Sequence, residues 1–400
     1  MNKYLTTKDI TKCCGCSACV ARCPRQCIGM TTDDDGFYVP AVLDANTCID
    51  CGLCAKVCPF ENPQSNDITT EFYAGYSQNE QFIMNSSSGG IFPELAAAFL
   101  KTGGKVYGAY MDDDYKLYHT GIKDLTDLPK LMRSKYYQSD IRNTYHECKQ
   151  DLIEGKKVLF SGVPCQIQGL KRFLGKDYGT LYTLDIICHG VPSPLMFNAF
   201  RSHLERKHGG KVVELNFRDK KKFGWSVAMK YVIKKPNGTR KEYVYNYSLS
   251  SYLRPFLMGL LTRESCYKCP FSSLERPGDI TLGDFFGYQI TRPELAHKEG
   301  LSLILVNSSK GYELKTICGD AGVILTDITE YNVRMSGTRN LYKPTERPEN
   351  RDVIYKSLHT KGIDYLIKTY FKPKLSLRQK IRYMLPNSLI AILKPLLKCK

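Results

Sequence analysis

Ten of the 17 cysteines fall within residues 11–60, and eight of these ten form two runs with identical spacing. The runs are Cys13-x2-Cys16-x2-Cys19-x3-Cys23-Pro24 and Cys48-x2-Cys51-x2-Cys54-x3-Cys58-Pro59. Two-residue gaps let one loop place three thiolates around a small cage, and this spacing with a closing Cys-Pro is typical of ferredoxins with two [4Fe–4S] clusters. The spacing therefore predicts two such clusters in residues 1–62.

The ligands of the two clusters are expected to cross between the runs. In two-cluster ferredoxins the last cysteine of each run ligates the other cluster. The predicted sets are therefore Cys13, Cys16, Cys19 and Cys58 for one cluster, and Cys48, Cys51, Cys54 and Cys23 for the other. Gly15 and Gly52 lie where the loops must turn tightly and bring backbone N–H groups to sulfur. Cys14 and Cys27 fall outside the pattern, and we interpret them as packing residues or bystanders.

Zinc and disulfides are the alternatives for so many clustered cysteines. Zinc sites typically pair two Cys-x2-Cys elements per metal, which leaves the third cysteine and the Cys-Pro of each run without a role. The N-terminus MNKYLTTKDI has no apolar signal segment, so we expect a reducing, cytoplasmic environment in which clustered cysteines are metal ligands.

Composition narrows the class of protein further. The chain has 400 residues, 42% of them hydrophobic, which is ordinary for a soluble protein of two or three units. A net charge of +17 suits nucleic acid, an anionic membrane or an acidic protein partner. Helix-turn-helix, RNP-like and zinc-finger patterns are missing from the sequence, so we expect no nucleic-acid partner.

From residue 71 onward, apolar runs of strand and helix length predict a mixed α/β domain. A helix is expected at 91–100, strands at 103–111, 156–165, 179–190, 279–289 and 301–308, and antiparallel strands with a turn at PNGTR in 215–247. The predicted organisation is a small dicluster ferredoxin-type domain at 1–62, a linker at 61–70, a mixed α/β domain at 71–325 and a basic helical extension at 326–400.

Four further cysteines can form another metal site. Cys165 and Cys188 each follow an apolar strand, and strand ends in an α/β sheet are where ligands gather. Cys266 and Cys269 form one Cys-x2-Cys element. Together the four can hold another cluster or one zinc. Alternatively, Cys165 and Cys188 are small buried apolar residues.

A turn of small residues precedes the predicted helix at 91–100. It consists of Ser87, Ser88, Gly89 and Gly90. Its free N–H groups and the positive end of the helix dipole suit a pyrophosphate, although a plain serine N-cap explains the same residues. No complete G-x-G-x-x-G follows a strand, so a Rossmann nicotinamide site is not predicted.

The order SSSGG, SKYYQSD, GVPCQ, CHGVPS, Cys-x2-Cys and DITLGDFFG resembles the coenzyme F-420 hydrogenase/dehydrogenase beta-subunit family over about residues 71 to 325. Members are iron–sulfur flavoproteins whose conserved cysteines bind a [4Fe–4S] cluster beside an FAD. The resemblance implies that a third [4Fe–4S] cluster is held by Cys165, Cys188, Cys266 and Cys269. It also implies an FAD near the Ser-Ser-Gly-Gly turn, with further contacts from Ser134, Lys135 and Gln138.

Other residues give weaker signals. His189 and Lys135 are candidates for proton donation or for stabilising a reduced flavin, although a lone histidine in a turn is more often structural. Asp284 is interpreted as a turn residue. The segment FRDKKKFGW (217–225) can grip an anionic substrate or acidic partner, or form a solvated hairpin edge. Residues 372–400 hold eight Lys or Arg and no acid, which suits either peripheral membrane contact or short packed helices.

These features predict an oxidoreductase that passes electrons in single file between the ferredoxin-type clusters, a third cluster and FAD, with a two-electron substrate at the flavin. Two alternatives remain open. The chain can be an electron-transfer subunit that relays electrons to a partner enzyme and has no substrate of its own, or its metal can be structural or sensory. The first two share every motif, so the expected partner is a redox protein or a small-molecule substrate.

Overall fold

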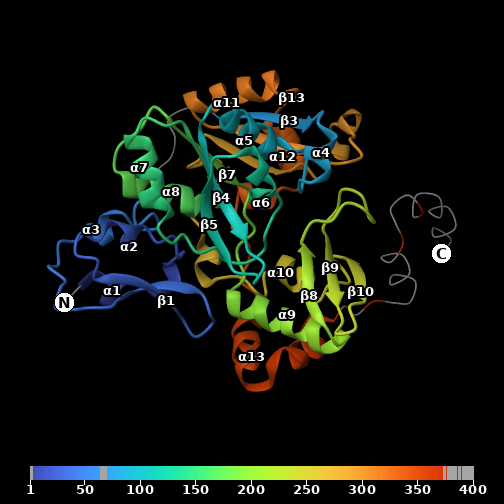
Figure 1. The fold of residues 1–400 in the computed structure, drawn as a ribbon, viewed down its shortest axis with the longest axis horizontal. Helices are drawn as coiled ribbons and strands as arrows, with labels where there is room; N and C mark the ends of the chain where they lie inside the picture. Colours follow the sequence, from blue (N-terminus) through green and yellow to red (C-terminus); the bar gives the residue numbers. More distant parts are fainter. Residues whose placement is uncertain (1–2, 64–69, 373–374, 376–384, 386–388, 390–400) are drawn as a thin grey trace.

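The computed structural model describes residues 3–63, 70–372, 375, 385 and 389, and in this part of the chain it contains three β-sheets (Figure 1). The first sheet belongs to an N-terminal module, coloured blue in Figure 1, that comprises residues 3–63. The elements of the module are α1 (Lys3–Thr7), α2 (Ala18–Arg22), α3 (Leu53–Lys56), β1 (Ile28–Thr32) and β2 (Tyr38–Val42). The two strands pair antiparallel, and loops that carry cysteines precede α2 and α3.

The main domain is organised by an eight-stranded mixed sheet with the strand order β13-β3-β12-β11-β7-β6-β4-β5. The strands are β3 (Glu71–Ser77), β4 (Lys105–Met111), β5 (Leu117–Ile122), β6 (Val158–Gly162), β7 (Leu181–Ile186), β11 (Ile280–Asp284), β12 (Ser302–Val306) and β13 (Val323–Ile328). The four central strands, β11, β7, β6 and β4, run parallel, and the outer strands pair antiparallel. The carboxyl ends of the parallel strands therefore meet at one edge of the sheet.

Helices cover both faces of the main sheet. They are α4 (Glu80–Met84), α5 (Ile91–Lys101), α6 (Leu128–Leu131), α7 (Thr144–Ile153), α8 (Pro164–Leu174), α11 (Ser309–Asp320) and α12 (Glu330–Met335). Leu159 of β6 packs in a core with residues of α5 and α11, whereas its neighbours Val158 and Phe160 pack in a core with residues of α7 and α8. Because successive strand residues point to opposite faces, the unbroken apolar run in β6 reflects burial on both sides.

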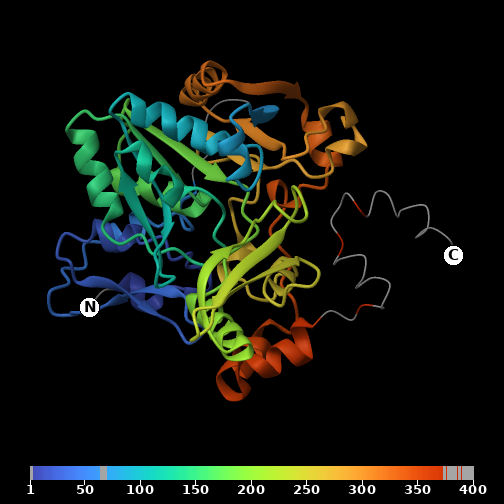
Figure 2. The same ribbon diagram turned by 45° about the vertical axis from the view of Figure 1, so that its right-hand side comes forward.

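A smaller antiparallel sheet, with the order β10-β9-β8, forms a second lobe. The elements of this lobe are α9 (Pro194–His208), β8 (Lys211–Asn216), β9 (Ala228–Lys234), β10 (Arg240–Asn246), α10 (Leu253–Leu257) and α13 (Arg351–Leu366). They share a core that includes Phe197, Tyr252 and Tyr355 of this lobe, together with Phe37 of the N-terminal module and Leu117 of β5. Figure 2 shows this lobe below the main sheet, with α13 at its far end.

The predicted mixed α/β fold is confirmed. The expected helix and strands appear as α5, β4, β6, β7, β11 and β12, and the antiparallel segment appears as β8, β9 and β10 with a turn between the last two. The predicted boundary between residues 325 and 326 falls inside β13, which extends the main sheet to Ile328.

The basic tail lies almost entirely outside the described residues, as do residues 64–69 of the predicted linker. Membrane contact by residues 372–400 therefore stays a prediction. Within the described ranges, none of the helices combines the length and the apolar character that a bilayer span requires.

Candidate functional site

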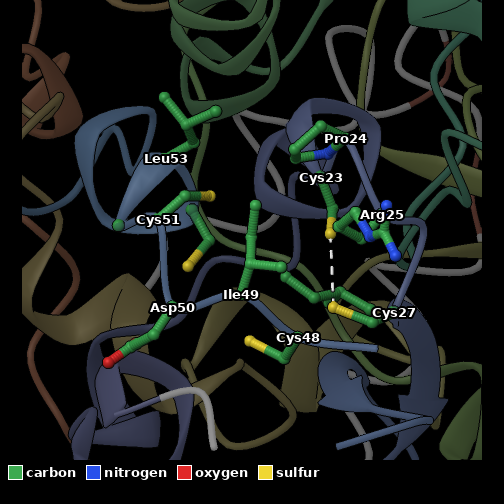
Figure 3. Close-up of a pocket in the computed structure, with 12 residues that line it drawn as sticks. Cys23, Pro24, Arg25, Cys27, Cys48, Ile49, Asp50, Cys51 and Leu53 are labelled. Carbon is green, nitrogen blue, oxygen red and sulfur yellow. Dashed lines mark hydrogen bonds between the residues drawn. The ribbon is translucent and has the colours of Figure 1, made fainter. Parts of the chain in front are cut away.

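Five cysteines line a small cavity in the N-terminal module, which we call the outer cavity (Figure 3). It has a volume of about 20 Å³. Four of the five are one of the predicted sets, Cys23, Cys48, Cys51 and Cys54. The fifth, Cys27, lies with its Sγ 3.4 Å from the Sγ of Cys23. Cys51 is exposed, so the outer cavity lies close to solvent.

A second cavity of about 20 Å³, the inner cavity, adjoins the outer one, and Cys54 lines both. Its wall contains the other predicted set, Cys13, Cys16, Cys19 and Cys58, together with Cys14. The two runs thus exchange their last cysteines between the cavities. Ligation of a cluster by each of these sets stays a prediction.

Two glycines allow the cysteine loops to turn. Gly15 and Gly52 have φ values of 66° and 71°, in the left-handed region that favours glycine. The N–H of Gly15 donates to the Sγ of Cys13 at 3.4 Å, as expected for a loop that wraps sulfur. A Cβ at Gly15 would lie 2.3 Å from the Nε2 of Gln138, whereas a Cβ at Gly52 would meet no atom within 4 Å.

The cysteines of the outer and inner cavities lie around the cavities and do not converge on a single point. Across residues 3–63 and 70–372, no three Cys, His, Asp or Glu side chains come together as the ligands of a single ion would. A cubane cage stands between its four sulfurs, so four thiols around a shared cavity fit it. Burial raises the pKa of Cys188 to about 11 and also raises the pKa of Cys19, so bound metal must displace thiol protons.

The remaining predicted cysteines line a third cavity, of about 40 Å³, which we call the junction cavity. Cys165 lies in the first turn of α8, directly after β6, and Cys188 follows β7. The 3-10 turn at Glu264–Lys268 brings Cys266 and Cys269 to the same wall. The four cysteines implied by the family resemblance therefore lie around one cavity.

Cys14 also lines the junction cavity, in addition to the inner cavity. Cys14 is predicted from the sequence to be a packing residue or a bystander, and it packs against the core that contains Cys16 and residues of α7 and α8. Motif spacing carries no information on its position between two cavities.

Three contacts dock the N-terminal module on the main domain near the junction cavity. The buried Arg263 donates from Nε to the carbonyl of Cys13 at 2.6 Å and from Nη1 to the carbonyl of Tyr38 at 3.0 Å. Gln138 accepts from the N–H of Tyr38 at 2.8 Å. At Gly169 of α8, an added Cβ would lie 3.1 Å from the Sγ of Cys16.

A buried ion pair braces the wall of the junction cavity. Arg276 donates from Nη2 to Asp185 Oδ1 at 2.7 Å, and both side chains are at most 1% exposed. The same guanidinium donates to the carbonyl of Ile186 at 2.9 Å. The N–H of Gly278 donates to Asp185 Oδ2 at 2.8 Å. The pair thus joins the end of β7 to the segment after Cys269.

A fourth, much larger cavity of about 280 Å³ lies at the carboxyl ends of β6, β7 and β11. Its volume is close to the lower end of the range for small-molecule sites, about 300–1,000 Å³. The lining includes the serine loop 86–88, the start of α5, the segment 133–137 and His119. We call it the large cavity.

Most residues predicted to contact flavin lie on the large cavity. They are Ser87, Ser88, Gly90, Ser134 and Lys135. Gln138 lies elsewhere, on the junction cavity and against the N-terminal module. Gly89 is engaged within the fold, because its N–H donates to the Oγ of Ser302 at 2.9 Å. His189 also lies on the junction cavity, with Nδ1 3.3 Å from Asn340 Oδ1, and not on the large cavity.

The start of α5 is not a serine cap. Gly90 is the N-cap residue, with φ 84°, and no side chain caps the helix there. Ser87 Oγ instead accepts from both the N–H and the hydroxyl of Ser134 at 2.9 Å, and Ser88 donates to the carbonyl of Leu301 at 2.9 Å. The serine side chains are thus bonded to other parts of the fold and do not cap the helix. The first N–H groups of α5 lie at the wall of the large cavity without a side-chain cap.

The segment 217–225 is partly buried and structural, not a solvated edge. Arg218 forms a two-point ion pair with Asp284 at 2.7 and 2.8 Å and donates to the carbonyl of Ser87 at 2.8 Å. Lys220 donates to the carbonyl of Ser88 at 2.6 Å. Trp225 donates to Asp284 at 2.9 Å. Arg218 and Lys220 thus hold the carbonyls of the serine loop, and Asp284 holds Arg218 and Trp225 in position.

The buried His119 and the half-buried Lys135 are titratable side chains that line the large cavity. His119 accepts at Nδ1 from the Ser139 hydroxyl at 2.8 Å and donates from Nε2 to the carbonyl of Ser161 at 3.2 Å, since a carbonyl can only accept. Burial lowers the pKa of His119 to about 4 and that of Lys135 to about 7. Sequence reasoning missed His119, because it sits inside an ordinary strand, β5.

The four cavities form a continuous series. The outer and inner cavities share Cys54, the inner and junction cavities share Cys14 and Gly15, and the junction and large cavities share Val163, Gln166 and Val191. Each neighbouring pair is therefore separated by no more than a wall of common residues.

Comparison with known proteins identifies the domains. Residues 155–330 match the family described as the C terminus of the coenzyme F420 hydrogenase/dehydrogenase beta subunit, and residues 12–62 match the 4Fe-4S dicluster domain. Two separate parts of the chain are thus similar to these two families. The resemblance stated from the sequence is thereby confirmed, and this beta-subunit domain contains Cys165, Cys188, Cys266 and Cys269.

Over 369 residues the chain is 26% identical to the coenzyme F420-dependent sulfite reductase of Methanocaldococcus jannaschii, with 86% of this chain and 52% of that protein covered. The chain thus spans about half the length of that relative. The N-terminal module is 34% identical over 65 residues to the ferredoxin 7Fe of Hydrogenibacillus schlegelii, with 16% of this chain and 76% of the ferredoxin covered.

Among solved structures, the chain is similar to one chain of a xenon-derivatized F420-reducing [NiFe] hydrogenase complex from Methanosarcina barkeri. The TM-score is 0.45 at 14% identity, with 74% of this chain and 94% of that chain covered.

Proposed function

We propose that this chain is an iron–sulfur flavoprotein oxidoreductase that passes electrons between three [4Fe–4S] clusters and an FAD. The outer, inner and junction cavities would each hold one cluster, and the large cavity would hold the flavin. The observation that carries the proposal is the series of shared walls: three consecutive cavities, each lined by four predicted ligand cysteines, adjoin one another, and the last adjoins one ligand-sized cavity.

The order of the cavities suits electron transfer in single file. Cubane clusters carry one electron each, and the protein tunes them through hydrogen bonds to sulfur and through burial. FAD, when bound, would supply the exchange between one-electron and two-electron chemistry. The chain's own part is to hold these groups close together and to exclude water between them.

Residues of the large cavity fit a phosphorylated flavin. The N-terminal end of α5 offers N–H groups and the positive end of a helix dipole. Lys135 donates to the carbonyls of Lys130 and Met132 at 3.2 and 2.9 Å, and an ammonium has a third N–H with which to meet a ligand. Arg218 and Asp284 hold the serine loop that forms this wall.

Coenzyme F420 is the two-electron substrate to test first. The relative that covers 86% of this chain is a coenzyme F420-dependent enzyme, and the matched beta-subunit family has the same coenzyme in its description. One observation favours relay to a partner as a second candidate function: this chain spans only 52% of that relative's length. In that case the chain would deliver electrons to a separate enzyme.

The test is metal and flavin analysis of the anaerobically purified full chain. About twelve irons and one flavin per chain are expected, because three cubanes hold four irons each. Cys266→Ser should lose about four irons, while Cys318→Ser, a buried cysteine outside the four cavities, should lose none. About eight irons with no flavin after added FAD would refute the flavin-centred mechanism.

A further inference from the structure

A buried lysine contacts one of the predicted cluster ligands. Lys8 follows α1, and its side chain is 3% exposed. Its Nζ donates to the Sγ of Cys58 at 3.4 Å, to the hydroxyl of Tyr4 at 2.9 Å and to Glu61 Oε1 at 3.0 Å. An ammonium has three N–H groups, so these three partners use all of them.

The first helix holds this lysine in position. The backbone N–H of Lys8 donates to the carbonyl of Tyr4 at 2.8 Å, and its Nζ lies 5.2 Å from the centre of the Tyr4 ring. Tyr4, Leu5 and Lys8 all line the inner cavity. Helix α1 therefore closes this cavity and places a positive charge at its wall.

The outer cavity is in a different electrostatic environment. The charged residues on its wall, Arg25 and Asp50, are exposed, and so is Cys51. Figure 3 shows both charged residues beside the cysteines of this cavity. Water and salt screen charges at such positions, whereas a buried charge is screened much less.

We propose that Lys8 raises the reduction potential of the cluster in the inner cavity above that of the cluster in the outer cavity. The inference rests on the proposed function, because it takes both cavities to hold clusters. Reduction adds one negative charge to a cluster and its thiolates. An ammonium that donates to a ligand sulfur stabilises this added charge. An electron is then favoured on the inner cluster, which adjoins the junction cavity.

The test is a redox titration of the anaerobic full-length protein, followed by the EPR signals of the reduced clusters. Lys8→Met should reduce the ratio of reduced to oxidised inner cluster about tenfold at a fixed potential, which is a fall of about 59 mV in one midpoint for a one-electron centre. Glu61→Gln should shift the same midpoint upward, because it removes the carboxylate that partly balances Lys8. Lys8→Arg should stay close to the original value.

Controls separate this effect from general damage. Lys56→Met removes an exposed lysine two positions before Cys58 and should shift no midpoint. The Lys8→Met shift should persist in a Cys51→Ser background, which alters only the outer cavity.

Two results would overturn the inference. In the first, the protein contains its iron and sulfide, yet no midpoint moves beyond the Lys56→Met control. In the second, Lys8→Met and Glu61→Gln move the midpoint in the same direction. An unsubstituted protein without iron would refute the proposed function as well.

Discussion

Substituting Gly15 by alanine tests how closely the N-terminal module packs on the main domain. The left-handed φ of 66° makes alanine unfavourable by about 1–2 kcal/mol. The added Cβ would also lie 2.3 Å from Gln138 Nε2 and 2.5 Å from the carbonyl oxygen of Tyr38. Overpacking of this kind costs about 1–3 kcal/mol. We expect Gly15→Ala to lower the free energy of unfolding by about 2–5 kcal/mol.

Gly52 provides a matched control in the second cysteine run. Its φ is 71°, yet an added Cβ would meet nothing within 4 Å, so Gly52→Ala should cost only the conformational part, about 1–2 kcal/mol. The assay is urea unfolding of the anaerobic protein, followed in parallel by circular dichroism and by cluster absorbance. Equal losses of unfolding free energy in the two variants would show that the module does not pack on Gln138 in solution. The inner and junction cavities would then not share a wall.

Three further predictions concern the main domain. Burial lowers the pKa of His119 from 6.5 to about 4, so the unfolded chain binds more protons between these pH values. The contribution of His119 to the free energy of unfolding is therefore fully present above about pH 6.5, and about 3 kcal/mol of it is lost as the pH falls to 4. In unfolding experiments at a series of pH values, His119→Gln should reduce this dependence of stability on pH. Arg276→Met should lower the free energy of unfolding, measured in urea, by about 3–5 kcal/mol because it leaves the buried carboxylate of Asp185 uncompensated. Adding Asp185→Asn should recover part of this loss. If the double variant recovers nothing, the two residues do not form the proposed pair. Lys135→Met should weaken flavin retention about tenfold in a fluorescence titration, with circular dichroism unchanged; unchanged retention would place the flavin away from Lys135.

Local patterns made part of the site predictable. The two cysteine sets of the N-terminal module could be predicted from two short runs, because their spacing with a closing Cys-Pro is typical of two-cluster ferredoxins. Cys165 and Cys188 could be placed at strand ends because a strand buried on both faces leaves an unbroken apolar run. The fold class followed from the same runs.

Contacts between distant segments could not be predicted in this way. Arg218 stands in a basic segment that suggests solvent exposure, but its partner Asp284 lies 66 residues later in the chain. Gln138 belongs to a family element, yet its amide binds the backbone of Tyr38 in the other domain. Lys8 has no motif at all, and only the packing of α1 brings it to Cys58. The positions of these side chains depend on how distant segments pack together, and such packing produces no periodic pattern in the sequence.

The composition of the junction cavity bears on how the protein is made. All residues that line the outer and inner cavities lie at or before Cys58 in the chain. The junction cavity takes Cys14 from the first part of the chain and Cys269 from far beyond it, and it forms only after the main sheet has assembled. In the order of synthesis, every residue of the two N-terminal cavities is therefore made well before the last residues that line the junction cavity.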